Sequence, residues 1–145
     1  MKLITGALLL AFTVVSCSLF ESDYGPCIHN FEDPVLVIAS VTSAEDDSTI
    51  EEVIISKVSI DSNLISTQDL VLEFSENIIL KDSVLTCTIP CGFGTNEGLY
   101  ELTFSAQGYF DLTLSTLAEY NNINGGCPSS SSGSHLLGFS LYSKP

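Results

Sequence analysis

The sequence predicts an all-β fold, a single antiparallel-rich β-sandwich of about seven strands within residues 34–145. Short runs of alternating apolar and polar residues recur along this part of the chain, and turn residues separate the runs at regular spacing. No window after residue 17 shows the apolar period of an amphipathic helix. The length is sufficient for one hydrophobic core and too short for two ordinary domains.

The expected strands follow one another with few interruptions. The first, over residues 35–41, is a nearly continuous apolar run between Pro34 and a polar turn. The second, over residues 53–60, alternates imperfectly. The other expected strands are 70–74, 78–89, 100–105, 109–114 and 136–142. The Gly- and Ser-rich residues 125–134 are expected to form a flexible loop before the last strand.

The clearest alternation predicts a central hairpin that joins residues 100–105 to residues 109–114. Apolar residues at every second position of a strand lie on one face of the sheet. The side chains expected in the core are Leu102, Phe104 and Leu112. Gly108 is expected at the turn, because a positive φ is accessible to glycine without steric cost.

The first seventeen residues have the pattern of a secretory signal. Lys2 supplies a positive charge, and residues 4–15 form an apolar run that is too short for a membrane-spanning helix. The run ends in Val14-Val15-Ser16-Cys17, which resembles the lipobox of bacterial lipoproteins. In that family the cysteine receives acyl chains such as palmitate and becomes the first residue, so the resemblance implies lipidation at Cys17. The alternative is an ordinary cleaved signal with an incidental cysteine.

The lipobox resemblance, the polar and turn-rich residues after it and the strand pattern together predict three parts in the chain. They are a signal peptide over residues 1–16, a lipidated cysteine with a polar tether over residues 17–33, and the sandwich over residues 34–145. The implied location is the bacterial cell envelope, at the outer membrane, with the signal peptide removed. The membrane would be contacted through the lipid, and an envelope protein would be the partner.

The charge balance excludes some partners. The sequence holds 18 acidic residues, four lysines and no arginine. Removal of residues 1–16 takes away Lys2 and leaves three lysines against the 18 carboxylates, a formal charge of −15. Nucleic acid is excluded as a partner because its phosphates need basic residues, and so is a polybasic contact with anionic lipid. Solubility is the simplest role for this charge.

Four cysteines beyond Cys17 predict a disulfide framework, because an even number in an exported chain is typical of one. They are Cys27, Cys87, Cys91 and Cys127. A zinc site built from the four thiolates is the competing interpretation, although no Cys-x-x-Cys pair occurs.

Residues 98–109, with the sequence GLYELTFSAQGY, resemble the G-x-Y-x-L-x-hydrophobic-x-A-x-G-Y segment of carboxypeptidase regulatory-like domains. The resemblance extends over roughly residues 34–142 and implies a transthyretin-like β-sandwich. Such domains are accessory modules without catalytic residues, so the resemblance implies binding or structural support and no enzymatic activity or cofactor. The chain departs from the family in the longer 125–134 loop and in a first acidic turn that lacks the usual glycine.

The pairs Cys87–Cys91 and Cys27–Cys127 are the expected disulfides. Pro90 in the short loop between the first two can bring them together. The second pair depends on the resemblance, because the first and last strands of transthyretin-like sandwiches can run side by side in parallel. The alternative pairing is Cys91–Cys127 with Cys27–Cys87.

Other candidate sites are an acidic cluster and two histidines. Calcium favours converging carboxylates, and the candidates are Glu45, Asp46, Asp47, Glu51 and Glu52, with a solvated acidic loop as the alternative. His29 and His135 lack metal-ligand spacing, and no Gly-x-Ser-x-Gly motif is present, so no catalytic residue is named. Two alternatives to a non-enzymatic envelope module remain. One is an exported domain that binds a small ligand, or binds carbohydrate with the help of calcium. The other is a hydrolase with an unrecognised site.

Overall fold

The computed structural model describes residues 26–66, 75–82 and 84–145, and its fold is all-β as predicted. Eleven strands occur in these residues, where about seven were expected. They are β1 (His29–Phe31), β2 (Leu36–Ser43), β3 (Glu52–Ile60), β4 (Asn63–Leu64), β5 (Ser75–Lys81), β6 (Val84–Phe93), β7 (Gly98–Ser105), β8 (Leu112–Ala118), β9 (Asn122–Asn124), β10 (Ser129–Ser132) and β11 (His135–Leu141). The strand expected at residues 70–74 lies outside the described residues, as does Cys17.

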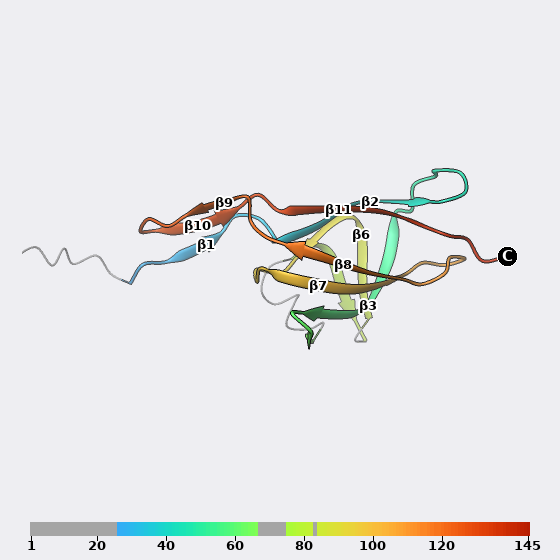
Figure 1. Cartoon of the computed structure of the whole chain (residues 1–145), viewed down its shortest axis with the longest axis horizontal. Coiled ribbons are helices and arrows are strands. Elements are labelled where there is room, and N and C mark those ends of the chain that lie inside the picture. The colour runs from blue at the N-terminus through green and yellow to red at the C-terminus, as the bar shows by residue number, and fades with distance from the viewer. Residues whose placement is uncertain (1–25, 67–74, 83) are drawn as a thin grey trace, which may run out of the picture.

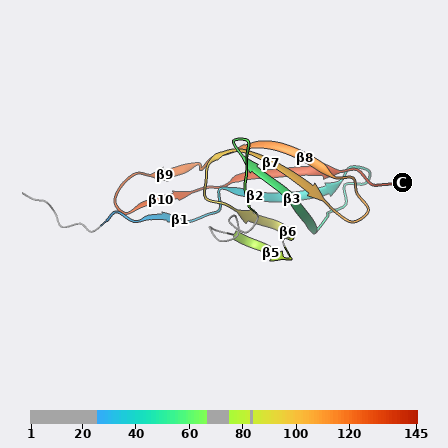
Figure 2. The same ribbon diagram turned by 90° about the horizontal axis from the view of Figure 1, so that it is seen from below.

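The body of the molecule is one strongly curved sheet that nearly closes into a barrel-like sandwich (Figures 1 and 2). The strand order is β11-β2-β6-β3-β7-β8, with β4 paired to β3 and β5 paired to β6. Strands β2 and β11, the first and last of the body, are parallel neighbours, and its other ladders in the described residues are antiparallel. The antiparallel-rich sandwich is therefore confirmed.

Strand β6 forms a corner of the body. Its first half pairs with β3, where Val53 is opposite Cys87, and its second half pairs with β2, where Ile38 is opposite Cys91. A strand that changes partners in this way carries the sheet from one layer to the other. The disulfide Cys87–Cys91 spans the corner, and both cysteines are buried.

The core fills the interior of the curved sheet. Its largest fully buried side chains are Tyr100, Phe93, Phe104, Leu36, Ile38, Ile55, Leu85, Leu102 and Leu141. Their positions alternate along β2, β3 and β7, as the period of a strand requires. Leu102 and Phe104 are buried as predicted, and the ring of Phe104 lies 4.4 Å from that of Phe139 on β11.

The predicted hairpin is present as β7 and β8, with Leu102 opposite Leu114 and a positive φ at Gly108. Two details differ from the prediction. The second strand begins at Leu112, because Tyr109 pairs with Ser143 after β11 instead of with β7. Leu112 packs against the core but is only half-buried, because β8 ends the strand order and, in the described residues, no ladder joins it to β11.

A second, three-stranded sheet in the order β1-β10-β9 forms an arm at one end of the body, opposite the C-terminus (Figures 1 and 2). Residues 29–31 lie in the expected tether and residues 129–132 in the expected loop, yet both form strands. The physical reason is that β1 and β10 are parallel, as β2 and β11 are, so the arm continues the pairing of the body. Cys27–Cys127 closes its outer end.

Candidate functional site

A hollow lies on the outer face of the sheet, where β4, β3, β7 and β8 run side by side. One cross-strand row passes through it, in which Ser59 is opposite both Leu64 and Glu101, and Glu101 is also opposite Ser115. The hollow has a volume of about 200 Å³ and is lined by Lys57, Ser59, Ser62, Leu64, Leu99, Glu101 and Ser115. The strand period places these residues outside because their neighbours in sequence, such as Leu102, face the core.

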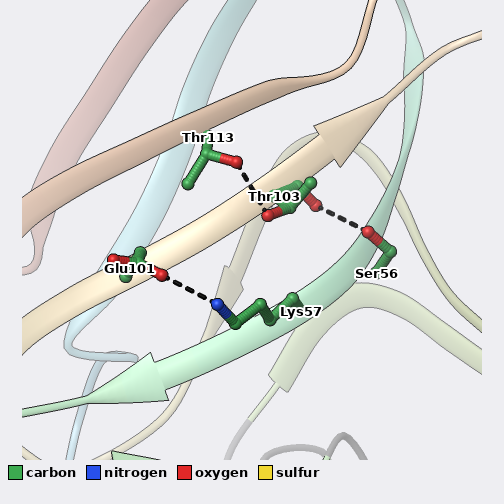
Figure 3. Close-up of polar contacts among 5 residues, drawn as sticks. All are labelled: Ser56, Lys57, Glu101, Thr103 and Thr113. Carbon is green, nitrogen blue, oxygen red and sulfur yellow. Dashed lines mark hydrogen bonds and ion pairs between the residues drawn. The ribbon is translucent and has the colours of Figure 1, made fainter. Parts of the chain in front are cut away.

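Polar cross-strand contacts order this face (Figure 3). Lys57 Nζ lies 3.0 Å from Glu101 Oε1, with 53% and 43% of the two side chains exposed. Beside this ion pair the hydroxyls of Thr103 and Thr113 are 2.9 Å apart, and the Ser56 hydroxyl donates to the Thr103 carbonyl oxygen over 3.4 Å. Such pairs each contribute about 0.2–1 kcal/mol and hold the side chains over the strands that carry them.

The chemistry of the hollow suits a small hydroxylated molecule. Lys57 can donate hydrogen bonds, the Glu101 carboxylate can accept them, and the serine hydroxyls can do either. Leu64 and Leu99 offer aliphatic surface, with 72% and 48% of their side chains exposed. An exposed ion pair adds little to stability, so its groups can exchange partners with a ligand at small cost.

The sequence prediction named none of the residues that line the hollow. A signal was nevertheless present: Glu101 and Thr103 alternate with the core residues Leu102 and Phe104, so they had to lie on the outer face. What could not be found was the set of partners from β3, β4 and β8, because the registers of these strands are set by long-range pairing.

The two predicted disulfides are confirmed. The Cα atoms of Cys27 and Cys127 lie 5.3 Å apart, and those of Cys87 and Cys91 lie 5.7 Å apart. Both separations fall within the range of disulfides. The alternative pairing and the four-thiolate zinc site are both wrong, because each sulfur is bonded to the other member of its predicted pair.

The acidic cluster lies at the turn between β2 and β3 and at the start of β3. Glu45 accepts hydrogen bonds from the Ser143 backbone N–H at 2.9 Å and from the Ser43 hydroxyl at 3.1 Å. The Ser143 N–H in particular holds the pKa of Glu45 below its ordinary value. Hydrogen bonds from the Ser43 and Ser48 hydroxyls likewise lower the pKa of Asp46. These oxygens are therefore engaged within the protein.

The other calcium candidates do not converge with Glu45 and Asp46. Asp47 is exposed in the turn with a φ of 57°, and Glu51 and Glu52 are exposed where β3 begins. In the described ranges, no three His, Cys, Asp or Glu residues are grouped so that they could hold a metal ion.

Each of the two histidines makes hydrogen bonds from its own strand to another strand. His29 on β1 makes hydrogen bonds to two serines of β10, with Nδ1 at 2.8 Å from the Ser129 hydroxyl and Nε2 at 3.1 Å from the Ser131 hydroxyl. His135 Nε2 lies 2.8 Å from the Thr116 hydroxyl, so it links β11 to β8. In a catalytic triad one ring nitrogen faces a carboxylate. Both nitrogens of His29 face hydroxyls instead, which favours a structural role.

The arm differs from the body in its surface. Residues 27–31 and 120–134 contain no Asp, Glu, Lys or Arg, although the whole chain has a formal charge of −14. Three of its apolar side chains are exposed: Ile28 at 64%, Ile123 at 61% and Phe31 at 40%. At the base of the arm, Asp33 accepts a hydrogen bond from the Gly133 N–H at 2.8 Å, which joins the segment between β1 and β2 to the segment between β10 and β11.

No helix within residues 26–66, 75–82 and 84–145 is long and apolar enough to cross a membrane. Comparisons of the chain with protein-family models, with curated proteins and with solved structures gave no match.

Proposed function

We propose that the protein is a non-enzymatic binding or structural module of the bacterial cell envelope, anchored to the outer membrane by lipid on Cys17. One observation carries the proposal. The N-terminal end of the described chain is fixed by Cys27–Cys127 to the outer end of an arm that projects from the body opposite the C-terminus (Figure 1). An anchor at Cys17 would therefore attach through a cross-linked arm, which would hold the body away from the membrane.

The outer face of the body, which carries the hollow, is the surface on which a partner would bind. Leu99 and Leu117 are directly opposite each other on β7 and β8, and 48% and 52% of their side chains are exposed. Exposed Leu64 lies at the other side of the hollow. Apolar side chains beside a polar rim are typical of surfaces that bind proteins or ligands. An accessory role without catalysis is also what the carboxypeptidase regulatory-like resemblance implies.

The anchor is tested by expressing the full chain and its Cys17→Ser variant in a bacterium. For the native chain we expect recovery in the membrane fraction and a mature N-terminal peptide that begins with a diacylglyceryl cysteine by mass spectrometry. The Cys17→Ser variant is expected to lose the lipid and the membrane association, and Ser18→Ala is the matched control that keeps both. A native chain cleaved elsewhere, with a bare thiol at Cys17, would contradict the proposal.

A second candidate function is the binding of a small hydroxylated ligand, and the hollow of about 200 Å³ with its Lys57–Glu101 pair favours it. NMR titration of the domain with a panel of monosaccharides is the test, with and without a calcium chelator. Binding would shift the amide signals of residues around Glu101 in the native domain and not in Glu101→Gln. Shifts that are unchanged in Glu101→Gln would place the ligand elsewhere.

A further inference from the structure

We propose that the uncharged arm, formed by β1, β9 and β10, lies against the lipid bilayer and so sets the orientation of the body above the membrane. The proposal rests on the lipid anchor at Cys17 proposed above and goes beyond it, because an anchor alone leaves the orientation open.

The distribution of charge favours the arm as the part nearest the lipid. An acidic protein is repelled by the negative surface potential of a membrane that contains anionic lipids. The carboxylates of the described chain lie on the body or, as Glu32 and Asp33, at the base of the arm. Residues 27–31 and 120–134 carry none, so the arm can approach headgroups without this repulsion.

The side chains of the arm suit the interfacial region. Ile28, at the outer end, and Ile123, on β9, are both more than 60% exposed. Phe31 is 40% exposed and stacks on Tyr120 at 6.0 Å between ring centroids. Burial of such apolar surface among acyl chains and headgroups is favourable. In addition, polar Asn and Ser side chains on the remaining positions can hydrogen-bond to headgroups and interfacial water.

The length of chain outside the structure limits where the arm can be. The ten residue steps from Cys17 to Cys27 span at most about 36 Å when fully extended. The described chain begins at residue 26, beside the Cys27–Cys127 bridge at the outer end of the arm. A lipid at Cys17 therefore keeps this end of the molecule within about 36 Å of the membrane surface, while the C-terminus lies at the far end. This geometry therefore favours the membrane as the partner that the arm contacts.

Tryptophan fluorescence can test the contact, because the chain contains no tryptophan. The lipidated variant Ile123→Trp is reconstituted into phosphatidylcholine vesicles in which part of the lipid carries brominated acyl chains. Tyr142→Trp is the matched control, since Tyr142 is 69% exposed and follows β11 at the far end of the body. We expect a blue-shifted emission for Ile123→Trp and about threefold stronger quenching by bromine than for Tyr142→Trp, because interfacial apolar groups reach about 5–10 Å into the acyl boundary.

A second variant tests the same contact at another residue of the arm. Adding Ile28→Asp to Ile123→Trp places a carboxylate at the outer end of the arm. Because burying an unpaired carboxylate in the interface is costly, this change should reduce the quenching at least about twofold while the protein still floats with the vesicles. Equal quenching of Ile123→Trp and Tyr142→Trp in protein that floats would overturn the arm contact and leave the anchor intact. Failure of the native chain to float would overturn the anchor and this proposal with it.

Discussion

The body and the arm are both β-sheet, but different interactions hold them together. In the body, inward side chains such as Ile55, Leu102 and Phe104 are completely buried. In the arm, β1 and β9 are exposed along their whole length, and Ser131 of β10 is its one buried strand residue. Burial of apolar surface therefore stabilises the body, whereas the arm depends on a covalent bridge and on polar contacts such as those of His29.

The two disulfides show the same contrast. Cys87 and Cys91 are buried and four positions apart, so their bridge fixes a local corner of β6. Cys27 and Cys127 are exposed and 100 positions apart, so their bridge restricts almost the whole unfolded chain. A bridge of this kind acts mainly on the unfolded state, and its effect grows with the length of the closed loop.

The largest expected effect follows from this difference. Loop-closure entropy predicts that the double variant Cys27→Ala/Cys127→Ala loses about 4.7 kcal/mol of unfolding free energy. The same relation predicts a loss of about 1.9 kcal/mol for Cys87→Ala/Cys91→Ala, before the packing of these buried residues is considered. Urea denaturation of both variants gives the comparison. A smaller loss for the arm bridge than for the corner bridge would show that the arm opens before the body unfolds.

A pair of phenylalanine substitutions tests the difference in packing. Phe104 is fully buried against Phe139, so Phe104→Ala is expected to cost about 3–5 kcal/mol of unfolding free energy. Phe31→Ala removes a ring that is 40% exposed, and the expected cost is below about 1.5 kcal/mol, the range of one aromatic pair. Denaturant titration measures both. Similar costs would mean that the arm contains a core of its own.

Much of the body could be predicted because its signal is local. The alternation of Tyr100, Leu102 and Phe104 gives the buried face of β7, and Gly108 marks the turn after it. The parallel contact between the first and last strands, and with it Cys27–Cys127, followed from the resemblance to transthyretin-like sandwiches. The half-buried state of Leu112 was missed, because it depends on the position of β8 at the end of the strand order, where no ladder to β11 forms in the part of the chain that the structure describes.

The arm could not be predicted from residue patterns. Strand β10 consists of four serines, which show no alternation and are not among the residues enriched in strands, and β1 and β9 are three residues each. Their pairing is imposed by the body, by His29 and by the disulfide. The hollow was missed for a related reason: its residues come from four strands, and only their registers bring Lys57 next to Glu101.

A smaller effect is expected at the hollow. The Lys57–Glu101 pair is about half exposed, and exposed ion pairs contribute about 0.2–1 kcal/mol. Lys57→Met and Glu101→Gln should therefore each change the unfolding free energy by less than about 1 kcal/mol. Thermal and urea unfolding measure this, with Thr113→Val as a control on the same face. A larger loss would indicate that this pair supports the fold of the body, and the case for a ligand would weaken.

Glu45 connects the turn after β2 to the C-terminal segment at the end of the body opposite the arm. Its carboxylate accepts the Ser143 backbone N–H, and this hydrogen bond holds its pKa below the ordinary value of 4.5. A carboxyl group whose pKa is lowered by folding stabilises the folded state when it is ionised. The stabilisation is present above the unfolded pKa and is lost as the pH falls through the lower folded pKa.

The smallest expected effect is thus a pH-dependent one. Glu45→Gln should destabilise the protein slightly at pH 7, and the difference from the native chain should disappear as the pH falls through the lowered pKa of Glu45, because the native carboxylate is then protonated as well. The side chain is fully exposed, so the effect is small and is best measured as a shift in the urea midpoint. Asp47→Asn is the matched control, because it removes the same charge from the same turn without touching the bond to Ser143. A Glu45→Gln difference that stays unchanged over the whole acidic range in which the protein remains folded would mean that the shape of the side chain, and not its charge, holds the C-terminal segment against the body.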